Sequence, residues 1–224
     1  MAPEPLAVAP QPRASLFVEA VAPCPVAGAD AVICDAPAEP ITEAARGPVI
    51  WRCAPGQSAP AGARVCVAEG GLAAAAQLRA AAPAALVVPR AEVQRLARRY
   101  SFATESSGSG FSTYHLDPAT VAGFEVEDGG RQIALADWLA EATRQGFFEL
   151  WLHSRDAAAA GLGFAGELLD RAHRMAPETG FWLSGGGRGA DDVARIQARP
   201  GLAALVLAQA ALADPDTGAA PAAT

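Results

Sequence analysis

A serine, three glycines and an arginine in succession are the residues of this chain that point most directly to chemistry. They follow a short apolar segment and precede a segment with helical periodicity. Glycines let backbone N–H groups approach a phosphate closely, and a helix that follows adds its positive end. We therefore expect a phosphate-binding loop, with a plain strand–helix turn as the alternative. Its residues are Ser184, Gly185, Gly186, Gly187 and Arg188.

A second pair of glycines, Gly70 and Gly71, stands between an apolar segment and an alanine-rich helical one. Glu69 directly precedes the pair, and its carboxylate would repel a phosphate. We include Gly70 and Gly71 as candidate phosphate contacts, although the pair is a poorer copy of the first loop.

Short apolar runs that alternate with helical patterns must position these loops. Near-continuous apolar runs are typical of strands buried on both faces, and strand–helix alternation predicts a parallel sheet. The expected strands are Leu16–Val21, Ala31–Asp35, Val49–Cys53, Arg64–Ala68, Ala85–Pro89, Phe111–Leu116, Phe148–His153, Phe181–Ser184 and Ala203–Ala208. The expected helices are Leu72–Ala82, Ala91–Arg99, Ala134–Gln145, Gly163–Arg174 and Ala190–Ala198.

This order predicts an α/β fold, a (β/α)8 TIM barrel of the ribulose-phosphate-binding type that is irregular in its N-terminal part. Nine candidate strands are one too many, and we place the excess in the first 60 residues, where proline is frequent. The stretch from Phe111 to Leu212 then forms the second half of the barrel. A hairpin over Phe124–Glu127 and the following Asp-Gly-Gly turn interrupts it.

The length of 224 residues suits one domain of this class. We expect a single barrel over residues 14–212. The tails, residues 1–13 and 213–224, are rich in alanine and proline, and we expect them to be disordered.

Composition excludes several classes of function. The net charge of −7 and the absence of a basic run argue against a nucleic-acid partner. All 17 basic residues are arginines, so lysine Schiff-base enzymes and pyridoxal-phosphate cofactors are excluded, and we expect no cofactor. The four cysteines form no Cys-x-x-Cys pair, so we expect reduced buried thiols and no metal. No apolar run could span a bilayer and no secretory signal is visible, so we expect a cytoplasmic protein without a membrane partner.

Four stretches resemble the histidine-biosynthesis barrels, namely the phosphoribosylformimino-aminoimidazole-carboxamide isomerase and the cyclase subunit of imidazole-glycerol-phosphate synthase. FSTYHLD (111–117) looks like their fifth strand, and AGFEVEDGGR (122–131) looks like the hairpin that follows. WLAEATRQGFFELWLHSRDAAAAG (138–161) is similar to their helix and sixth strand, and FWLSGGGRGADDVARI (181–196) is similar to their phosphate loop. Upstream, residues 28–36 and 65–93 resemble the second strand and the third and fourth strands.

The resemblance implies acid–base isomerisation of a phosphorylated sugar or phosphoribosyl-type metabolite. Asp117 matches an aspartate that acts as general acid or base in an aldose-to-ketose rearrangement. Its carboxylate partner would be Asp35 or Glu19, and the sequence leaves that choice open. Asp156 matches a retained aspartate of the substrate site.

Two alternatives remain open. Ala208-Gln209-Ala210 stands where the family has a glycine-rich phosphate turn. This favours a degenerate, non-catalytic barrel that supports a protein partner or assembles as a homo-oligomer. The other alternative is an isomerase or lyase recruited to the biosynthesis of a small cofactor of the pterin or furan kind.

Overall fold

A computed structural model of the chain describes residues 14–21, 26–37, 48–96, 100–103, 113–116, 123–161 and 163–211, with backbone only for residues 100–103 and 113–116. The two tails, which we expect to be disordered, and Asp117, an expected catalytic residue, lie outside the described residues.

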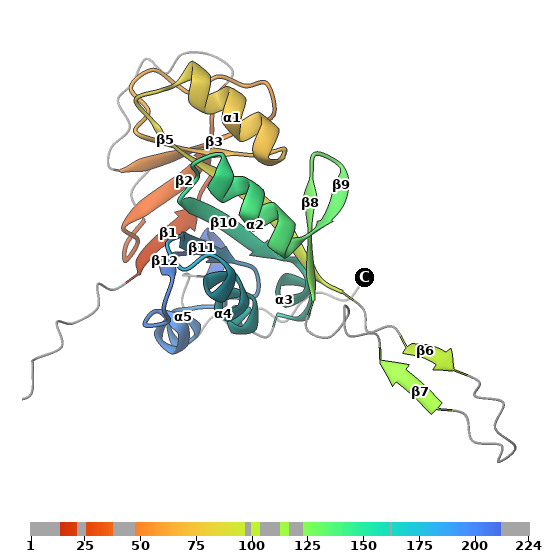
Figure 1. Cartoon of the computed structure of the whole chain (residues 1–224). Coiled ribbons are helices and arrows are strands. Elements are labelled where there is room, and N and C mark those ends of the chain that lie inside the picture. The colour runs from red at the N-terminus through yellow and green to blue at the C-terminus, as the bar shows by residue number, and fades with distance from the viewer. Residues whose placement is uncertain are drawn as a thin grey trace, which may run out of the picture.

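Eight parallel strands form a closed barrel, which confirms the predicted (β/α)8 fold (Figure 1). Strands β1 and β12 pair with each other, as do β5 and β10, and these two pairings close the sheet. In chain order the barrel strands are β1 (Ser15–Glu19), β2 (Ala31–Asp35), β3 (Val49–Cys53), β4 (Val65–Ala68), β5 (Leu86–Arg95), β10 (Glu149–Ser154), β11 (Gly180–Ser184) and β12 (Leu202–Ala208).

The helices cluster around the later strands. They are α1 (Gly71–Ala81), α2 (Leu135–Arg144), α3 (Arg155–Ala160), α4 (Gly166–Met175) and α5 (Ala190–Ile196), with the 3₁₀ turn η2 (Gln209–Ala211) after β12. The described parts of the connections from β1 to β4 contain no helix, so the N-terminal part is irregular as predicted. No helix among the described residues is long and apolar enough to cross a membrane.

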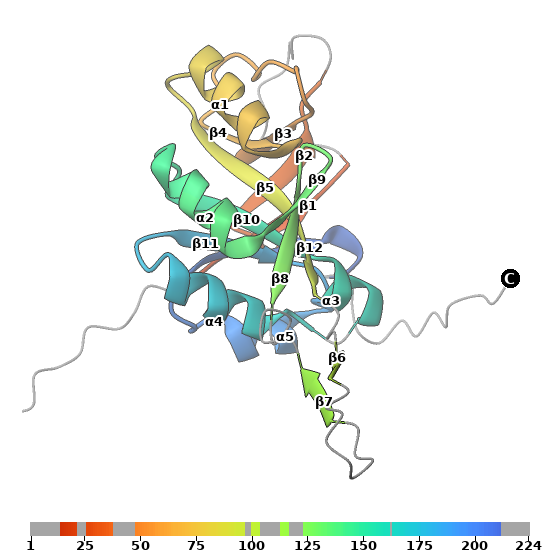
Figure 2. The same cartoon turned by 45° about the vertical axis from the view of Figure 1, so that its right-hand side comes forward.

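Two antiparallel hairpins are inserted between β5 and β10. The first joins β6 (Tyr100–Ala103) to β7 (Thr113–Leu116) and projects away from the barrel (Figures 1 and 2). The second joins β8 (Phe124–Asp128) to β9 (Arg131–Ala134), as the sequence predicted, and β8 pairs with the far end of β5.

The assignment of Phe111–Leu116 to the fifth barrel strand is wrong. Thr113–Leu116 pairs only with β6, in a separate two-stranded sheet, and the fifth barrel strand is β5. The excess strand therefore lies in this hairpin and not in the first 60 residues. The predicted helix Ala91–Arg99 is also wrong, because β5 continues to Arg95 between its partners β10 and β8.

Apolar side chains fill the lower part of the barrel interior. Trp151 and Trp182 lie there with their ring centroids 6.3 Å apart, and Phe17 meets Trp182 edge-on at 4.8 Å. Smaller side chains from the other strands, including Ile33, Val67 and Val88, complete this cluster. The lower interior is thus a packed core, and polar chemistry is confined to the ends of the barrel.

A single carboxylate ties the second hairpin to two helices. Asp128 Oδ1 accepts hydrogen bonds from the backbone N–H of Leu72, in the first turn of α1, and from Nε1 of Trp138 in α2, at 2.8 and 3.2 Å. Trp138 is fully buried, so its N–H depends on this acceptor.

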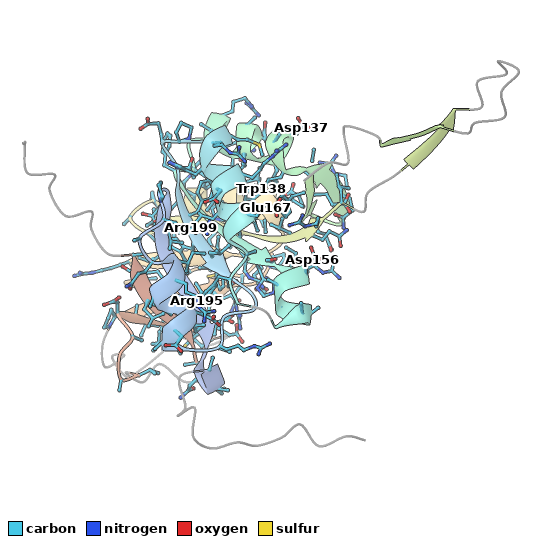
Figure 3. All side chains as sticks on the ribbon, turned by 90° about the horizontal axis from the view of Figure 1, so that it is seen from below. Asp137, Trp138, Asp156, Glu167, Arg195 and Arg199 are labelled. Carbon is cyan, nitrogen blue, oxygen red and sulfur yellow. The ribbon has the colours of Figure 1, made fainter. Side chains whose placement is uncertain are left out.

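Replacing Asp128 by alanine should lower the free energy of unfolding by about 1–3 kcal/mol, because a buried donor then loses its acceptor. Chemical denaturation measures this loss. Asp137→Ala is the control, since Asp137 is exposed in the first turn of α2 (Figure 3). Equal effects of the two substitutions would show that Asp128 does not tie these elements together.

Candidate active site

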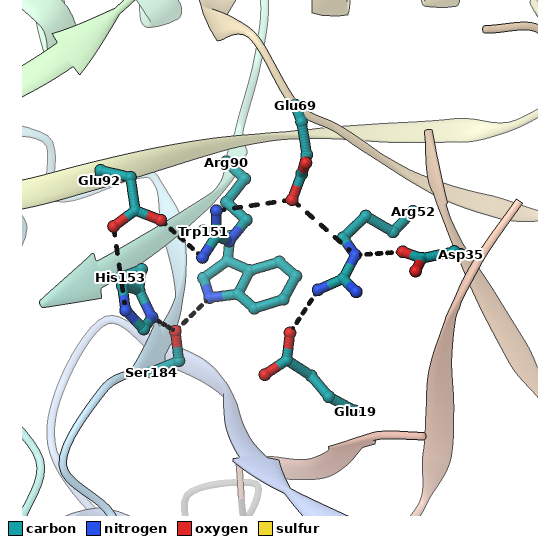
Figure 4. Close-up of polar contacts among 9 residues, drawn as sticks. All are labelled: Glu19, Asp35, Arg52, Glu69, Arg90, Glu92, Trp151, His153 and Ser184. Atoms are coloured by element: carbon teal, nitrogen blue, oxygen red, sulfur yellow. Dashed lines mark hydrogen bonds and ion pairs between the residues drawn. The ribbon is translucent and has the colours of Figure 1, made fainter. Parts of the chain in front are cut away.

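The carboxyl ends of the barrel strands carry a layer of polar side chains directly above the apolar core. Figure 4 shows these side chains converging from β1, β2, β3, β5, β10 and β11 and from the residue after β4. We call this set the mouth layer: Glu19, Asp35, Arg52, Glu69, Arg90, Glu92, His153 and Ser184. Active sites of (β/α)8 enzymes lie at this end, so the mouth layer is the candidate site.

Arg52 binds the two carboxylates that the sequence offered as alternatives. Its Nη1 lies 2.7 Å from Glu19 Oε1 and its Nε lies 2.6 Å from Asp35 Oδ1. Burial alone lowers the pKa of Arg52, but the hydrogen bond to Asp35 and the charges of Asp35, Glu19 and Glu69 together raise it. The guanidinium therefore stays charged, and Glu19 and Asp35 are held as its counter-ions.

Glu69 and Arg90 extend this network across the mouth. Glu69 Oε1 lies 3.8 Å from Arg52 Nε and 3.5 Å from Arg90 Nη1, so it is shared by two guanidinium groups. Arg90 Nη2 lies 2.7 Å from Glu92 Oε1, and its guanidinium carbon lies 5.1 Å from the centre of the Trp151 ring. A chain of alternating charges thus runs from β1 to β5.

His153 stands at the end of this chain, between Glu92 and Ser184. It is the register partner of Glu92 on β5 and of Ser184 on β11. Its Nε2 lies 3.9 Å from Glu92 Oε2, and its Nδ1 lies 2.8 Å from Ser184 Oγ. Burial lowers the pKa of His153, and Arg90 and Arg155 lower it further, against the opposing charges of Glu92 and Glu19. The imidazole is therefore neutral at pH 7.

The predicted phosphate loop follows β11 as expected, and its glycines are required by packing. A side chain at Gly185 would meet the carbonyl oxygen of Ser154, and one at Gly186 would meet the carbonyl oxygens of Ala157 and Gly163. Both glycines also have positive φ. Close packing against the start of α3 thus accounts for glycine at these positions without a ligand.

Internal carboxylates already lie at both glycine loops. The backbone N–H of Arg188 donates to Asp192 Oδ2 at 3.0 Å, just before α5. At Gly70 and Gly71, the Asp128 carboxylate accepts from Leu72 N–H and lies against Gly71. A phosphate at either loop would meet one of these negative charges.

Asp156 lies outside the mouth layer. It is in the first turn of α3, where its carboxylate accepts a hydrogen bond from the backbone N–H of Arg95 at the end of β5 (Figure 3). The structure therefore gives Asp156 a contact that holds β5 against α3. Of the predicted catalytic residues, Glu19 and Asp35 lie together at the mouth, and Asp117 is outside the described residues.

Arg52 and Glu92 were missed from the sequence. Glu92 falls within the predicted helix, yet polar and apolar residues alternate from Arg90 to Gln94. Such alternation has the period of a strand, so it was a signal for a longer β5. Arg52 had no comparable signal, because its role depends on carboxylates from other strands.

Among the described residues, no group of three or more His, Cys, Asp or Glu side chains is placed to hold a metal ion. No protein-family model matches the sequence, and no curated protein matches it.

Removing the charge of Arg52 should destabilise the barrel. Arg52→Gln leaves Glu19 and Asp35 close together without a counter-ion, and we expect a loss of about 1–2 kcal/mol, less than for a fully buried pair because the site is partly solvated. The loss should shrink at pH 4, where carboxylates are partly protonated.

Denaturation curves at pH 7 and pH 4 measure both effects. Arg155→Gln is the matched control, since the ion pair of Arg155 with Glu127, at 3.6 Å, is exposed. A loss that is the same at both pH values would contradict the proposed charge pairing.

Proposed function

We propose that this chain is an enzyme that moves protons by acid–base catalysis on a small hydroxy-carbonyl metabolite, in the manner of an aldose–ketose isomerase. The observation that carries the proposal is the pair formed by the Glu92 carboxylate and the neutral His153 imidazole. The two groups face each other 3.9 Å apart at the mouth, too far for a direct hydrogen bond. A carboxylate base opposite a neutral imidazole is an arrangement that supports enolisation.

Glu92 suits the role of base better than the residues first expected. Glu19, Asp35 and Glu92 each contact an arginine closely through one oxygen. Glu92 differs from the other two because its second oxygen faces His153. That oxygen can take a proton from the carbon next to a substrate carbonyl.

The other members of the mouth layer are placed to bind hydroxyl groups. Carboxylates accept hydrogen bonds from hydroxyls, and guanidinium groups donate to them. Arg52, Glu69 and Glu19 offer both kinds of partner side by side along the strands next to the base. A polyhydroxylated carbonyl compound, such as a sugar, matches this arrangement.

The resemblance to the histidine-biosynthesis barrels adds a phosphate group to the proposed substrate. Loops after the seventh and eighth strands are the usual phosphate site of such barrels. Here these are the loop Ser184–Arg188 and the turn η2 after β12. Binding there requires Arg188 to outweigh the Asp192 carboxylate, which lies against the same loop.

Proton exchange with solvent tests the catalytic proposal. The protein is incubated in D2O with a panel of aldose and ketose phosphates and phosphoribosyl compounds, and deuterium uptake beside the carbonyl is followed by proton NMR. Glu92→Gln should slow the exchange by about 10²- to 10⁴-fold, the usual contribution of a general base.

The control is Glu127→Gln, because Glu127 is the register neighbour of Glu92 on β8 but forms its ion pair with Arg155 at the surface. Exchange with no substrate of the panel, or equal rates in the two variants, would count against the proposal and favour a non-catalytic barrel.

Phosphate binding is tested separately by thermal unfolding with inorganic phosphate and with the phosphorylated compounds. A ligand at a hundredfold excess over its Kd should stabilise the fold by about 2.7 kcal/mol. Arg188→Gln should weaken this stabilisation, and Asp192→Asn should strengthen it, because the competing negative charge is lost.

Arg199→Gln serves as the control for a nearby cation that is not in the loop, since Arg199 pairs with Asp170 at 2.6 Å and not with Asp192. If phosphate stabilises the wild type and the Arg188→Gln variant equally, the phosphate lies elsewhere.

A further inference from the structure

We infer that Ser184, oriented by Trp151, fixes His153 in the tautomer that carries its proton on Nε2, so that the ring presents an N–H group toward Glu92. The tautomer follows from the hydrogen bonds alone, whereas the catalytic use that we assign to it rests on the proposed function. It assigns positioning roles to two side chains of the barrel interior.

The first step concerns the direction of the hydrogen bonds at Ser184. Trp151 Nε1 lies 2.7 Å from Ser184 Oγ, and an indole N–H can only donate. The serine oxygen therefore accepts from Trp151. The serine hydrogen remains free to donate to a second partner.

The second step identifies that partner. His153 Nδ1 lies 2.8 Å from Ser184 Oγ, and no other acceptor among the described residues lies within hydrogen-bond distance of this hydroxyl. Ser184 is only 2% exposed and Trp151 is fully buried. If Nδ1 carried the proton, the serine hydrogen would be buried without an acceptor, which folded proteins avoid. Nδ1 is therefore the acceptor (Figure 4).

The third step follows from the chemistry of imidazole. A neutral ring with an accepting Nδ1 must carry its proton on Nε2. Nε2 is the atom that faces Glu92 Oε2 at 3.9 Å. The ring thus points a donor, and Glu92 points an acceptor, toward the same space at the mouth.

Burial of the ring is the main effect that lowers the pKa of His153 and favours the neutral state over the imidazolium. Among the surrounding charges, Glu92 and Glu19 favour the imidazolium, and Arg90 and Arg155 oppose them. The serine donor adds to the effect of burial, because protonation at Nδ1 would require the hydroxyl to turn away.

In the proposed reaction the Nε2–H group donates a hydrogen bond to the substrate carbonyl oxygen. Glu92 takes the proton from the neighbouring carbon, which leaves an enediolate with its charge on the former carbonyl oxygen. His153 Nε2–H gives its proton to that oxygen and takes back the hydroxyl proton of the neighbouring carbon, and Glu92 returns its own proton to the former carbonyl carbon. The carbonyl group thus moves by one carbon, and no electrons are gained or lost overall. A ring with its proton on Nδ1 would present a lone pair to the oxygen and would repel it.

Nitrogen-15 NMR of the histidine side chains tests the inference directly and without a substrate. The chain has only three histidines, and the signal of His153 is assigned by its loss in His153→Gln. At pH 7.5 the wild type should show an unprotonated Nδ1 and a protonated Nε2. A protonated Nδ1, or an imidazolium, would overturn the inference.

Ser184→Ala should make the Nδ1–H tautomer detectable and lower kcat by about tenfold to a hundredfold, as expected when a reacting group loses its orientation. Ser154→Ala is the matched control. Ser154 is a buried serine on the same strand as His153, but its hydroxyl accepts from Ala157 N–H at the start of α3. An unchanged tautomer in Ser184→Ala would also overturn the inference.

The two proposals fail in different ways. If the tautomer is found but no compound exchanges protons with solvent, the positioning of His153 stands and the proposed function fails. If exchange occurs but Nδ1 carries the proton, the function stands and the assigned tautomer is wrong.

Discussion

Closure of the sheet, through the pairing of β1 with β12 and of β5 with β10, is the constraint on which the rest of the structure depends. Side chains of a strand alternate between two faces, and closure turns one of those faces into a shared interior. The strands therefore send side chains into the same small volume at each level. At the carboxyl ends of β1, β2, β3, β5, β10 and β11, and directly after β4, those side chains are charged or polar, whereas the level below is apolar.

The apolar core in the lower barrel interior determines how the charges above it must be arranged. Charges beside a core of Trp151, Trp182 and branched aliphatic side chains are stable only when they are paired. Arg52 and Arg90 meet this need, because each contacts carboxylates from at least two different segments of the chain. Once these pairs are formed, Glu92 and His153 are the titratable neighbours that face each other without a direct bond. This is the end of the layer at which we propose proton transfer.

The glycine loops show how one sequence feature can serve two purposes. Gly185 and Gly186 permit a close approach, but in this structure the groups that approach are backbone carbonyls at the start of α3 and beyond it. The adjacent helix starts are met by Asp192 and Asp128 from within the chain. The Asp128 contact holds α1 against the second hairpin, and the Asp192 contact is local to the loop before α5. A phosphate that binds at either loop must therefore compete with a carboxylate that is already in place.

The sequence by itself determined the fold class and the positions of all eight barrel strands along the chain, because an apolar run between turns is a local property. It also placed Glu19, Asp35 and Ser184 at strand ends, where the structure has them. It could not decide that Thr113–Leu116 pairs outside the barrel, since a β-forming run looks the same whichever partner it finds. The alternation around Glu92 is compatible with a strand, but only the pairing of β5 with both β8 and β10 decides that the strand continues there. The contacts of Arg52 and of His153 join residues from separate strands, and only closure of the barrel brings those strands together.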